Sequence, residues 1–331
     1  MPDRRSAQAE RRLQQSFSKS SVFSGLLIAG LVVGTQSLLS RMPDREARPD
    51  SQAAVLYEPV ELKAGQGEVQ PAGAWRIRSR EARFGGLSAL GIQGDRLVAL
   101  NDSGVVIGLP RPGASPAMAS FRDLPDGPGD PGRKSRRDSE ALARLSDGDW
   151  LVAFENRNRI WRYDPAFEHG RQVVSFMHQG WATNRGIEAM AFDSGGRLVA
   201  IPEGYGTLVA IKDVVETRPL ASLGWTVSDA ARLPDGRLFV LLRRVTVTGF
   251  RNAIGELVHD RAGWRIAERG RLPLGMFDNA EGLTAEPLAG SGTRLWIVTD
   301  NDFTAYRRTL LIAVDLPAAG PKARHDAIRP R

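Results

Sequence analysis

The chain repeats one short pattern five times: an acidic or small polar residue, a few apolar residues, a glycine-centred turn and a strongly apolar strand. The reference residues of successive copies are separated by 52, 48, 41 and 52 residues. A period of roughly 40–50 residues built from short strands is typical of a β-propeller. Rotational symmetry would gather the reference residues around one axis, so the repeat bears on both fold and site. These residues are Ser88, Glu140, Glu188, Asp229 and Glu281.

From Trp75 onward the sequence has the pattern of short β-strands, because its apolar runs are brief and bounded by turns. Asp147-Gly148 and Asp235-Gly236 provide tight turns, since glycine tolerates positive φ. Each copy is followed by a third strand candidate and often by a fourth, which is the composition of a propeller blade. The third candidates are 105–109, 159–163, 207–211, 253–258 and 309–316, and the fourth are 172–177 and 265–269.

The sequence therefore predicts an all-β fold, a single β-propeller of five or six four-stranded blades over residues 71–317, after an N-terminal hydrophobic segment. Ring closure would pair a strand at 75–80 with the terminal strand at 309–316, which removes exposed sheet edges. Residues 124–137 are rich in Pro, Gly and Arg and are expected to form a surface loop. The basic end of this loop is either solvated or in contact with an anionic substrate.

The first forty residues resemble a targeting segment, because basic residues precede an apolar run at 22–39. We expect residues 1–40 to be a signal peptide or an uncleaved signal anchor in the inner membrane. The anchor is favoured because no small-x-small cleavage site follows the run, and a buried hairpin helix is the alternative. Either targeting interpretation places the body outside the cytoplasm, in the periplasm or secreted. Residues 41–70 are expected to be a flexible linker and 318–331 a basic disordered tail.

Composition excludes several function classes. The formal net charge is +7, but residues 1–50 and 318–331 each contribute +3, which leaves the body near +1 and gives no indication of nucleic-acid binding. The chain has no cysteine, which excludes disulfides and cysteine nucleophiles. It has four histidines, none within a repeat core, so a Ser-His-Asp site or a zinc site has little support. We expect a monomer.

Acidic residues recur both at the reference positions and at the ends of the second strands. Carboxylates that converge on one axis repel each other unless cations neutralise them, and hard oxygen ligands suit Ca²⁺, or less readily Mg²⁺. The alternative is that each acid pairs with an arginine and ties blades together. The predicted metal ligands are Asp102, Glu140, Glu188, Glu203, Asp229, Glu281 and Asp300.

Arginines accompany these acids, and Arg185 and Arg243 are the two candidates for holding an anion. A guanidinium can bind a phosphate or carboxylate through two hydrogen bonds. Neutralisation of neighbouring acids is the alternative role. In a metal-assisted reaction at such a site, Glu188 would act as the general base. The predicted catalytic residues are therefore Glu188, Arg185 and Arg243.

The motifs of these copies, taken in order, resemble those of the bacterial phytase-like family described as "esterase-like activity of phytase". The resemblance covers about residues 84–316 and implies a secreted or periplasmic propeller that hydrolyses phosphoesters or esters. This chain has Leu242-Arg243 where similar proteins usually have Glu-Arg, so one expected acid is absent. The matching motifs are Gly86-Leu-Ser, Ala99-Leu-Asn-Asp-Ser-Gly104, Asp138-Ser-Glu-Ala-Leu, Asn184-Arg-Gly-Ile-Glu-Ala189, Pro202-Glu-Gly204, Ser228-Asp229, Asn279-Ala-Glu-Gly-Leu283 and Val298-Thr-Asp-Asn-Asp-Phe303.

Two functions remain open from the sequence. The first is an extracytoplasmic, metal-assisted phosphoester or ester hydrolase that acts on an anionic small molecule with bound Ca²⁺. The second is a membrane-anchored, non-enzymatic propeller that uses the same site to bind a ligand or a protein.

Overall fold

The computed structural model describes residues 45–182, 185–290 and 292–318 of the chain. The predicted signal segment at 1–40 and all but the first residue of the predicted tail at 318–331 lie outside these residues. Within the described part, no helix is long and apolar enough to cross a bilayer. The described residues belong to the compact unit Met42–Arg331.

The described strands form a β-propeller of four-stranded antiparallel units; four units are runs of consecutive strands, and the last one is completed by an early strand. The first two units follow the predicted repeat closely, and the third strands at 105–109 and 159–163 have the predicted bounds. In the first unit the strands are β4 (Leu87–Gln93), β5 (Arg96–Asn101), β6 (Val105–Leu109) and β7 (Met118–Asp123). In the second they are β8 (Ser139–Arg144), β9 (Trp150–Phe154), β10 (Arg159–Tyr163) and β11 (Gly170–Ser175).

Three more units continue the series among the described residues. The third contains β12 (Ile187–Phe192), β13 (Leu198–Pro202), β14 (Thr207–Ile211) and β15 (Val215–Ala221). The fourth contains β16 (Thr226–Arg232), β17 (Leu238–Thr246), β18 (Gly249–Asp260) and β19 (Gly263–Arg271). The fifth contains β20 (Asn279–Pro287), β21 (Thr293–Asp300), β22 (Leu310–Leu316) and β3 (Pro71–Ser79).

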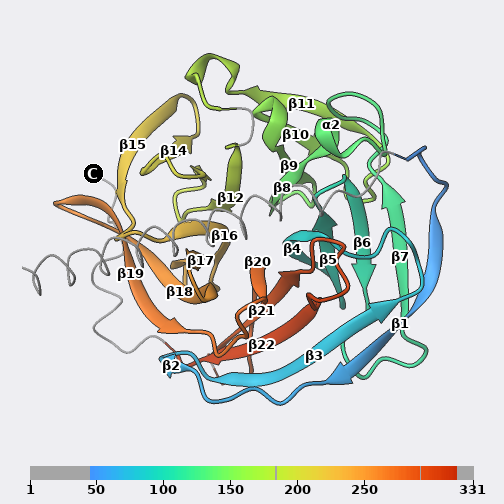
Figure 1. The fold of residues 1–331 in the computed structure, drawn as a ribbon. Helices are drawn as coiled ribbons and strands as arrows, with labels where there is room; N and C mark the ends of the chain where they lie inside the picture. The colour runs from blue at the N-terminus through green and yellow to red at the C-terminus, as the bar shows by residue number, and fades with distance from the viewer. Residues whose placement is uncertain (1–44, 183–184, 291, 319–331) are drawn as a thin grey trace, which may run out of the picture. The chain divides into compact units, whose positions relative to one another are not determined.

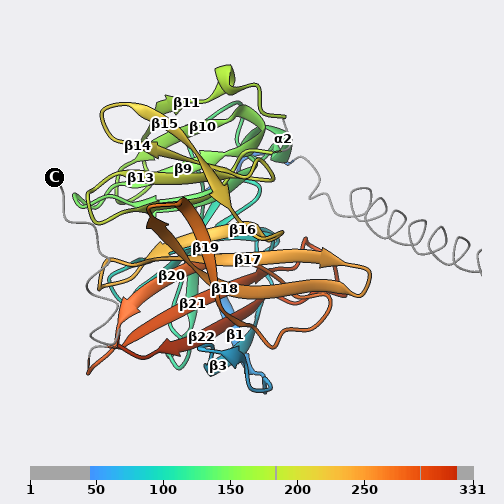
Figure 2. The ribbon, with the colours of Figure 1, turned by 90° about the vertical axis from the view of Figure 1, so that its left-hand side faces the viewer.

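The first strand of each unit lies next to the axis of the ring. Strands β4, β8, β12, β16 and β20 contact one another in that order, and β20 contacts β4 (Figure 1). The side view shows the successive units stacked around this centre (Figure 2). Since every first strand runs in the same sense, equivalent residues of the five strands lie at the same end of the axis. The repeat therefore positions a site by symmetry.

Closure of the ring joins the two ends of the described chain. β3 pairs antiparallel with β22, and Trp75 lies opposite Leu311. The predicted pairing of an early strand with the terminal strand is confirmed. The closing strand begins at Pro71, so it includes residues before the predicted 75–80.

The predicted linker at 41–70 is wrong over residues 51–59, where the structure contains the nine-residue strand β1 (Ser51–Pro59). β1 pairs with β3 along one edge and with β7 along the other, so it bridges the fifth and first units. The short strand β2 (Gln66–Gly67) adds to β19. The segment is ordered because backbone groups of β1 form hydrogen bonds with the outer strands of two sheets. These partners are far away in the sequence, so local composition could not predict the strand.

The loop predicted at 124–137 is more ordered than expected. It ends in the one-turn helix α2 (Lys134–Arg137), where Arg137 is buried and donates to the main-chain carbonyls of Leu124 (3.1 Å) and Gly129 (2.8 Å). The basic end of the loop is therefore partly inside the protein, and Arg137 holds the loop against the first unit.

Apolar side chains between neighbouring units make up the core. Trp150 of β9 is a representative residue, because its ring is buried and stacks on Phe167 at 5.5 Å between centroids. Burying an aromatic side chain of this kind stabilises the fold by about 2–3 kcal/mol. Such contacts hold each first strand rigidly against its neighbours and leave the strand ends free to carry polar side chains.

Candidate functional site

Each first strand contains one residue that has no partner opposite it in the second strand. The pairing register skips this residue in all five units, which is the geometry of a β-bulge. Side chains of a strand alternate between the two faces of the sheet, and a bulge turns one side chain out of this alternation. Here the bulge lies at the beginning of the strand next to the axis. We call these residues the bulge set: Ser88, Glu140, Glu188, Ser228 and Glu281.

A second set of equivalent residues lies where the second strands end. In each unit this residue either pairs with, or donates its main-chain N–H to, the first-strand residue that stands two positions before the bulge residue. Glu155 N, for example, donates to Asp138 O at 2.7 Å. We call these residues the strand-end set: Asp102, Glu155, Glu203, Arg243 and Asp300. Four of the five are acids, so the two sets place seven carboxylates and one guanidinium at one end of the ring, the acid end.

One predicted ligand, Asp229, does not belong to the bulge set. The bulge residue of the fourth unit is Ser228, and Asp229 pairs with Leu241 one position deeper in the strand. Its carboxylate is completely buried and accepts main-chain N–H groups from Ala230 (2.8 Å) and Leu283 (2.6 Å). Because its oxygens accept hydrogen bonds from a neighbouring unit, Asp229 ties β16 to β20. The prediction that it belongs to the ion-binding cluster is therefore corrected.

Five acids of the acid end form two overlapping groups of three. In each group, one carboxylate oxygen per residue lies within 4.8 Å of the others. Glu155 belongs to both groups and so links the second unit to the third. The groups are Asp138, Glu140 and Glu155, and Glu155, Glu188 and Glu203. Three converging carboxylate oxygens are the start of a hard-cation site, to which waters or a substrate oxygen would add ligands.

Burial raises the pKa of most of these acids, and neighbouring negative charges raise it further. The pKa values of Glu140 and Glu188 lie well above the ordinary range, first because of burial and next because of Asp138 beside Glu140 and Glu203 beside Glu188. Burial and Asp138 raise the pKa of Glu155 to about 8. The cluster therefore holds more negative charge than its surroundings neutralise, which is the electrostatic condition under which a cation binds.

Burial also raises the pKa values of Asp300 and Asp102 in the strand-end set. Burial raises the pKa of Asp300 to about 8, with the charge of Asp102 as the next cause. Burial raises the pKa of Asp102 to about 6, against the opposing charge of Lys134. Asp102 Oδ1 is buried and accepts no hydrogen bond from the described residues. A buried oxygen without a donor is costly unless a cation or water completes it.

Two cations partly neutralise the acid end. Arg243 occupies the position that acids occupy in the other four units, and its guanidinium donates to Glu281, to Asn279 Oδ1 (3.3 Å) and to Glu203 Oε1 (3.4 Å). The ammonium of Lys134 in α2 binds the carboxylate of Asp102. Arg243 therefore supplies one of the predicted acid–arginine pairs, and Lys134 brings the 124–137 loop onto the site.

The structure brings together most of the predicted residues and adds three. Glu140, Glu188 and Glu203 join the two three-acid groups, Glu281 pairs with Arg243, and Asp102 and Asp300 lie beside each other. Arg185 is exposed in the segment before β12. Glu155, Asp138 and Lys134 belong to the site although they were absent from the predicted set. The sequence signal for Glu155 was its place at the end of a second strand, which it shares with Asp102 and Glu203.

Close backbone approach supports the geometry around Glu155. A Cβ on Gly186 would lie 2.5 Å from the Cα of Glu155, so only glycine fits between the second and third units at this point. Gly186 also accepts the N–H of Glu203 at 3.0 Å. This glycine lets two members of the strand-end set approach one cation position.

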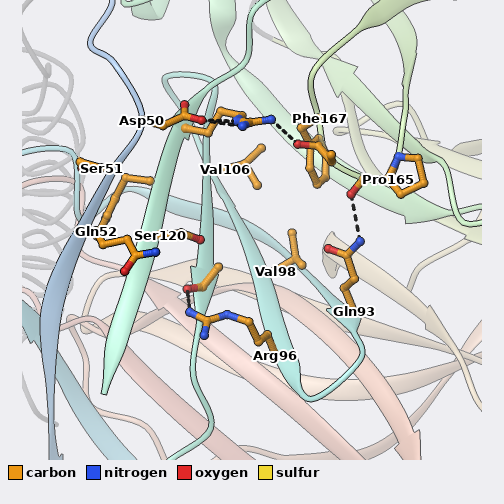
Figure 3. Close-up of a pocket in the computed structure, with 14 residues that line it drawn as sticks. Asp50, Ser51, Gln52, Gln93, Arg96, Val98, Val106, Ser120, Pro165 and Phe167 are labelled. Atoms are coloured by element: carbon orange, nitrogen blue, oxygen red, sulfur yellow. Dashed lines mark hydrogen bonds and ion pairs between the residues drawn. The ribbon is translucent and has the colours of Figure 1, made fainter. Parts of the chain in front are cut away.

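Two pockets lie away from these acids. One, of about 470 Å³, is on the side of the propeller between the first and second units, where Gln93 donates to the carbonyl of Pro165 (2.9 Å) and Arg96 extends below Val98 (Figure 3). The other, of about 750 Å³, is lined by the opposite ends of the first strands, with Leu142 and Met190 among its apolar residues. Neither pocket contains a member of the bulge or strand-end sets.

Fold and site together define a β-propeller whose first strands carry a carboxylate cluster at one end of the axis. The family model for "Phytase-like: Esterase-like activity of phytase" matches residues 82–303, more than half of the chain. The chain belongs to this phytase-like family, as its motifs predicted. The matched segment includes every member of the two sets.

Several solved structures are similar to this chain at low sequence identity. A glutaminyl cyclase from Myxococcus xanthus is 10% identical, with a TM-score of 0.48, and the match covers 77% of this chain and 100% of that chain. A gluconolactonase from Xanthomonas campestris is 11% identical, with a TM-score of 0.40 and coverage of 82% and 98%. Virginiamycin B lyase from Staphylococcus aureus is 13% identical, with a TM-score of 0.34 and coverage of 82% and 76%. A search of curated proteins found no match.

Proposed function

We propose that this chain is an extracytoplasmic hydrolase that uses Ca²⁺ at its acid end to cleave a phosphoester or carboxylic ester. Membership of the phytase-like family supports the reaction class. The basic residues followed by the apolar run at 22–39 support a location outside the cytoplasm, with the chain tethered to the inner membrane. The observation on which the metal site rests is the pair of three-oxygen groups that share Glu155.

The residues present fit a hard divalent cation. Their ligand atoms are all carboxylate oxygens, which select Ca²⁺ or Mg²⁺ over zinc, and the absence of cysteine removes thiolate competitors. The buried Asp102 Oδ1 lacks a donor, and the raised pKa values of Glu155 and Asp300 indicate surplus negative charge. A bound Ca²⁺ would supply Lewis-acid polarisation of the ester and favour deprotonation of a nearby water.

The chain's own residues have distinct roles in this proposal. Glu188 is buried, and its raised pKa makes it a stronger base than an ordinary carboxylate, so it accepts the proton from the attacking water. Arg243 is held by Glu203 and Glu281 and faces the negative charge that develops on the ester oxygens. The exposed Arg185 attracts the anionic substrate to the site.

A second function has one specific observation in its favour. Arg243 already pairs with Glu203 and Glu281, and Lys134 with Asp102, so three acids have a partner without any metal. An acid end neutralised in this way suits a non-enzymatic propeller that binds a ligand or a protein. Calcium binding without turnover would select this second function.

The test combines binding and turnover on the full chain. We expect calorimetry to detect Ca²⁺ binding, and phosphate release from phytate or p-nitrophenyl phosphate to require Ca²⁺ and to stop with EDTA. Turnover that persists in EDTA would contradict the metal-assisted mechanism. Hydrolysis of a p-nitrophenyl carboxylic ester, with no phosphate released from either phosphoester, would show that the substrate is a carboxylic ester.

Matched variants separate site from structure. Glu140→Gln with Glu188→Gln is expected to abolish Ca²⁺ binding and turnover while circular dichroism remains unchanged. Asp213→Asn, at an exposed aspartate, is the control and leaves both readouts unchanged. Loss of the fold in the double variant would show that these acids are structural.

A further inference from the structure

Exposed apolar side chains gather at the acid end of the propeller. Large hydrophobic side chains are exposed at Met276, Phe277 and Tyr306, each near half of the maximum, and Val247 at the tip of the β17–β18 hairpin is 82% exposed. We call the following residues the rim patch: Leu223, Val245, Val247, Met276, Phe277 and Tyr306. Contiguous apolar surface of this kind marks an interaction site.

Contacts show that the rim patch is continuous. Phe250 N donates to Met276 O at 2.8 Å, so the β17–β18 hairpin lies on the 272–278 loop near its tip. The rings of Phe277 and Tyr306 pack edge to face at 5.9 Å. The guanidinium of Arg244 donates to the carbonyl of Leu223 at 2.9 Å, which joins the 222–225 turn to β17.

The patch borders the acid end directly. Arg243, of the strand-end set, is two residues before Val245 in β17. The β17–β18 hairpin projects past the first strands toward the same side of the propeller as α2 (Figure 2). Lys134 of α2 contacts Asp102, which places α2 and the hairpin at the same end of the axis. The apolar rim and the acid cluster therefore share one face.

Exposed arginines surround this face. Arg157 and Arg251 are exposed beside the ends of β9 and β18, and Arg185 is exposed before β12. Guanidinium groups around apolar side chains suit the interfacial region of a bilayer, where apolar groups insert and cations meet phosphates. The rim patch has this composition, whereas a soluble protein partner would need no surrounding positive charge.

The position of Arg45 also supports docking on a bilayer. Arg45 binds Asp123 through both carboxylate oxygens (2.6 and 2.7 Å), and its N–H donates to Gly132 O at 3.0 Å. Gly132 precedes α2 by two residues, so Arg45 lies at the acid end. The predicted apolar run ends at Leu39, six residues earlier, and six residues span at most about 20 Å.

We propose that the acid end of the propeller rests on a lipid bilayer, with the rim patch inserted among the headgroups and glycerol backbone. The five residues between Leu39 and Arg45 keep this end near the surface in which the apolar run is expected to insert, and rim arginines contact lipid phosphates. The ligand is the bilayer surface itself. The proposal does not depend on hydrolase activity, since a binding propeller would dock in the same way.

The test uses the full chain and its lack of cysteine. A single fluorophore is attached at Val247→Cys, or at Val214→Cys as the control, because Val214 is 64% exposed in the β14–β15 turn at the opposite end. Each protein is reconstituted into phosphatidylcholine–phosphatidylglycerol vesicles that contain lipids with a nitroxide on the acyl chain. We expect the fluorophore at position 247 to be quenched at least about threefold more than the one at 214.

Equal quenching at the two positions would overturn the proposal. No quenching at position 247 in co-sedimenting protein would also overturn it, since a second copy or another protein segment would then cover the patch. Failure of the chain to co-sediment with vesicles has the same consequence.

Introducing negative charge into the rim patch provides a second measurement. The fluorophore is placed at Met177→Cys, which is exposed after β11 at the same end, and Val245→Glu with Val247→Glu is expected to reduce its quenching by at least half. Val214→Glu with Val215→Glu is the matched control at the opposite end and leaves the quenching unchanged. Equal effects of the two pairs would contradict docking through the rim patch.

Discussion

Glu188 and Ser228 occupy the same bulge position in neighbouring units, and Asp229 lies one residue deeper, where the other units have alanine or glycine. Acids therefore have two different roles in the propeller. Carboxylates in the bulge set line the acid end, whereas Asp229 accepts main-chain N–H groups and joins units. The two kinds of acid respond differently to substitution.

Asp229→Asn is expected to lower the free energy of unfolding by about 2–3 kcal/mol, because the amide turns one acceptor into a donor that faces a main-chain N–H. Calcium affinity should stay within about twofold of the unmodified chain. Chemical denaturation and calorimetry measure the two effects. A large loss of Ca²⁺ binding in a folded Asp229→Asn variant would show that Asp229 contributes to the ion-binding cluster.

Glu155→Gln should have the opposite pattern. Glu155 belongs to both three-acid groups, so the variant removes one ligand charge from each and lowers calcium affinity by about tenfold or more. Stability without calcium should rise or stay constant, because the variant relieves the repulsion that raises the pKa of this acid to about 8. Equal calcium affinity in the variant and the unmodified chain would contradict the assignment of Glu155 as the shared ligand.

Without divalent cations, stability should decrease as the pH rises from about 5 to about 9. The pKa values of Glu155 and Asp300 are raised to about 8, so the folded protein binds more protons than the unfolded chain between the ordinary carboxyl range and pH 8. The difference in bound protons makes the free energy of unfolding fall across that interval. Melting temperatures in EDTA measure it, and added calcium should flatten the profile. A stability that increases over this range would be inconsistent with surplus negative charge.

Gly186→Ala should disturb the site through packing. The added methyl group would overlap the Cα of Glu155, so β9 or the 185–187 segment must shift, at a cost of about 1–3 kcal/mol. Calcium affinity should fall together with stability. Gly195→Ala is the control, because its nearest contact is the side chain of Asp193 at 3.3 Å. Equal effects of the two variants would exclude a specific role for the close approach at Gly186.

Arg243→Met should make stability depend on calcium. The variant leaves Glu281 and Glu203 without their guanidinium partner, and breaking such a buried pair costs about 3–5 kcal/mol. Calcium should recover part of this loss, so the calcium-induced rise in melting temperature should be larger than in the unmodified chain. Arg237→Met removes an arginine that pairs with Asp235 away from the site and serves as the control.

The sequence predicted the repeat and most of the acids because both follow from local pattern. Apolar runs bounded by glycine turns located strands such as β6, β10 and β14 with their observed bounds. Acids at the ends of second strands were visible for the same reason, since a carboxylate after a buried strand interrupts the pattern.

Register and long-range pairing could not be read in this way. Ser228 and Asp229 are adjacent, and only the skipped pairing of β16 with β17 decides which one faces the acid end. β1 has an ordinary composition and becomes a strand because the edges of β3 and β7 are available to it. Lys134 reaches Asp102 from the end of a loop that Arg137 anchors to the first unit.

The closing unit has a consequence for the order of events during synthesis. β3 is made before any of the five first strands, yet its partner β22 contains residues 310–316. When only the chain up to β19 has emerged from the ribosome, strands β20–β22 are still missing. The fifth unit, which lies between the fourth and the first, therefore cannot yet form. Completion of the ring, and with it the convergence of Asp300 and Asp102, therefore comes late, after β22 has been made.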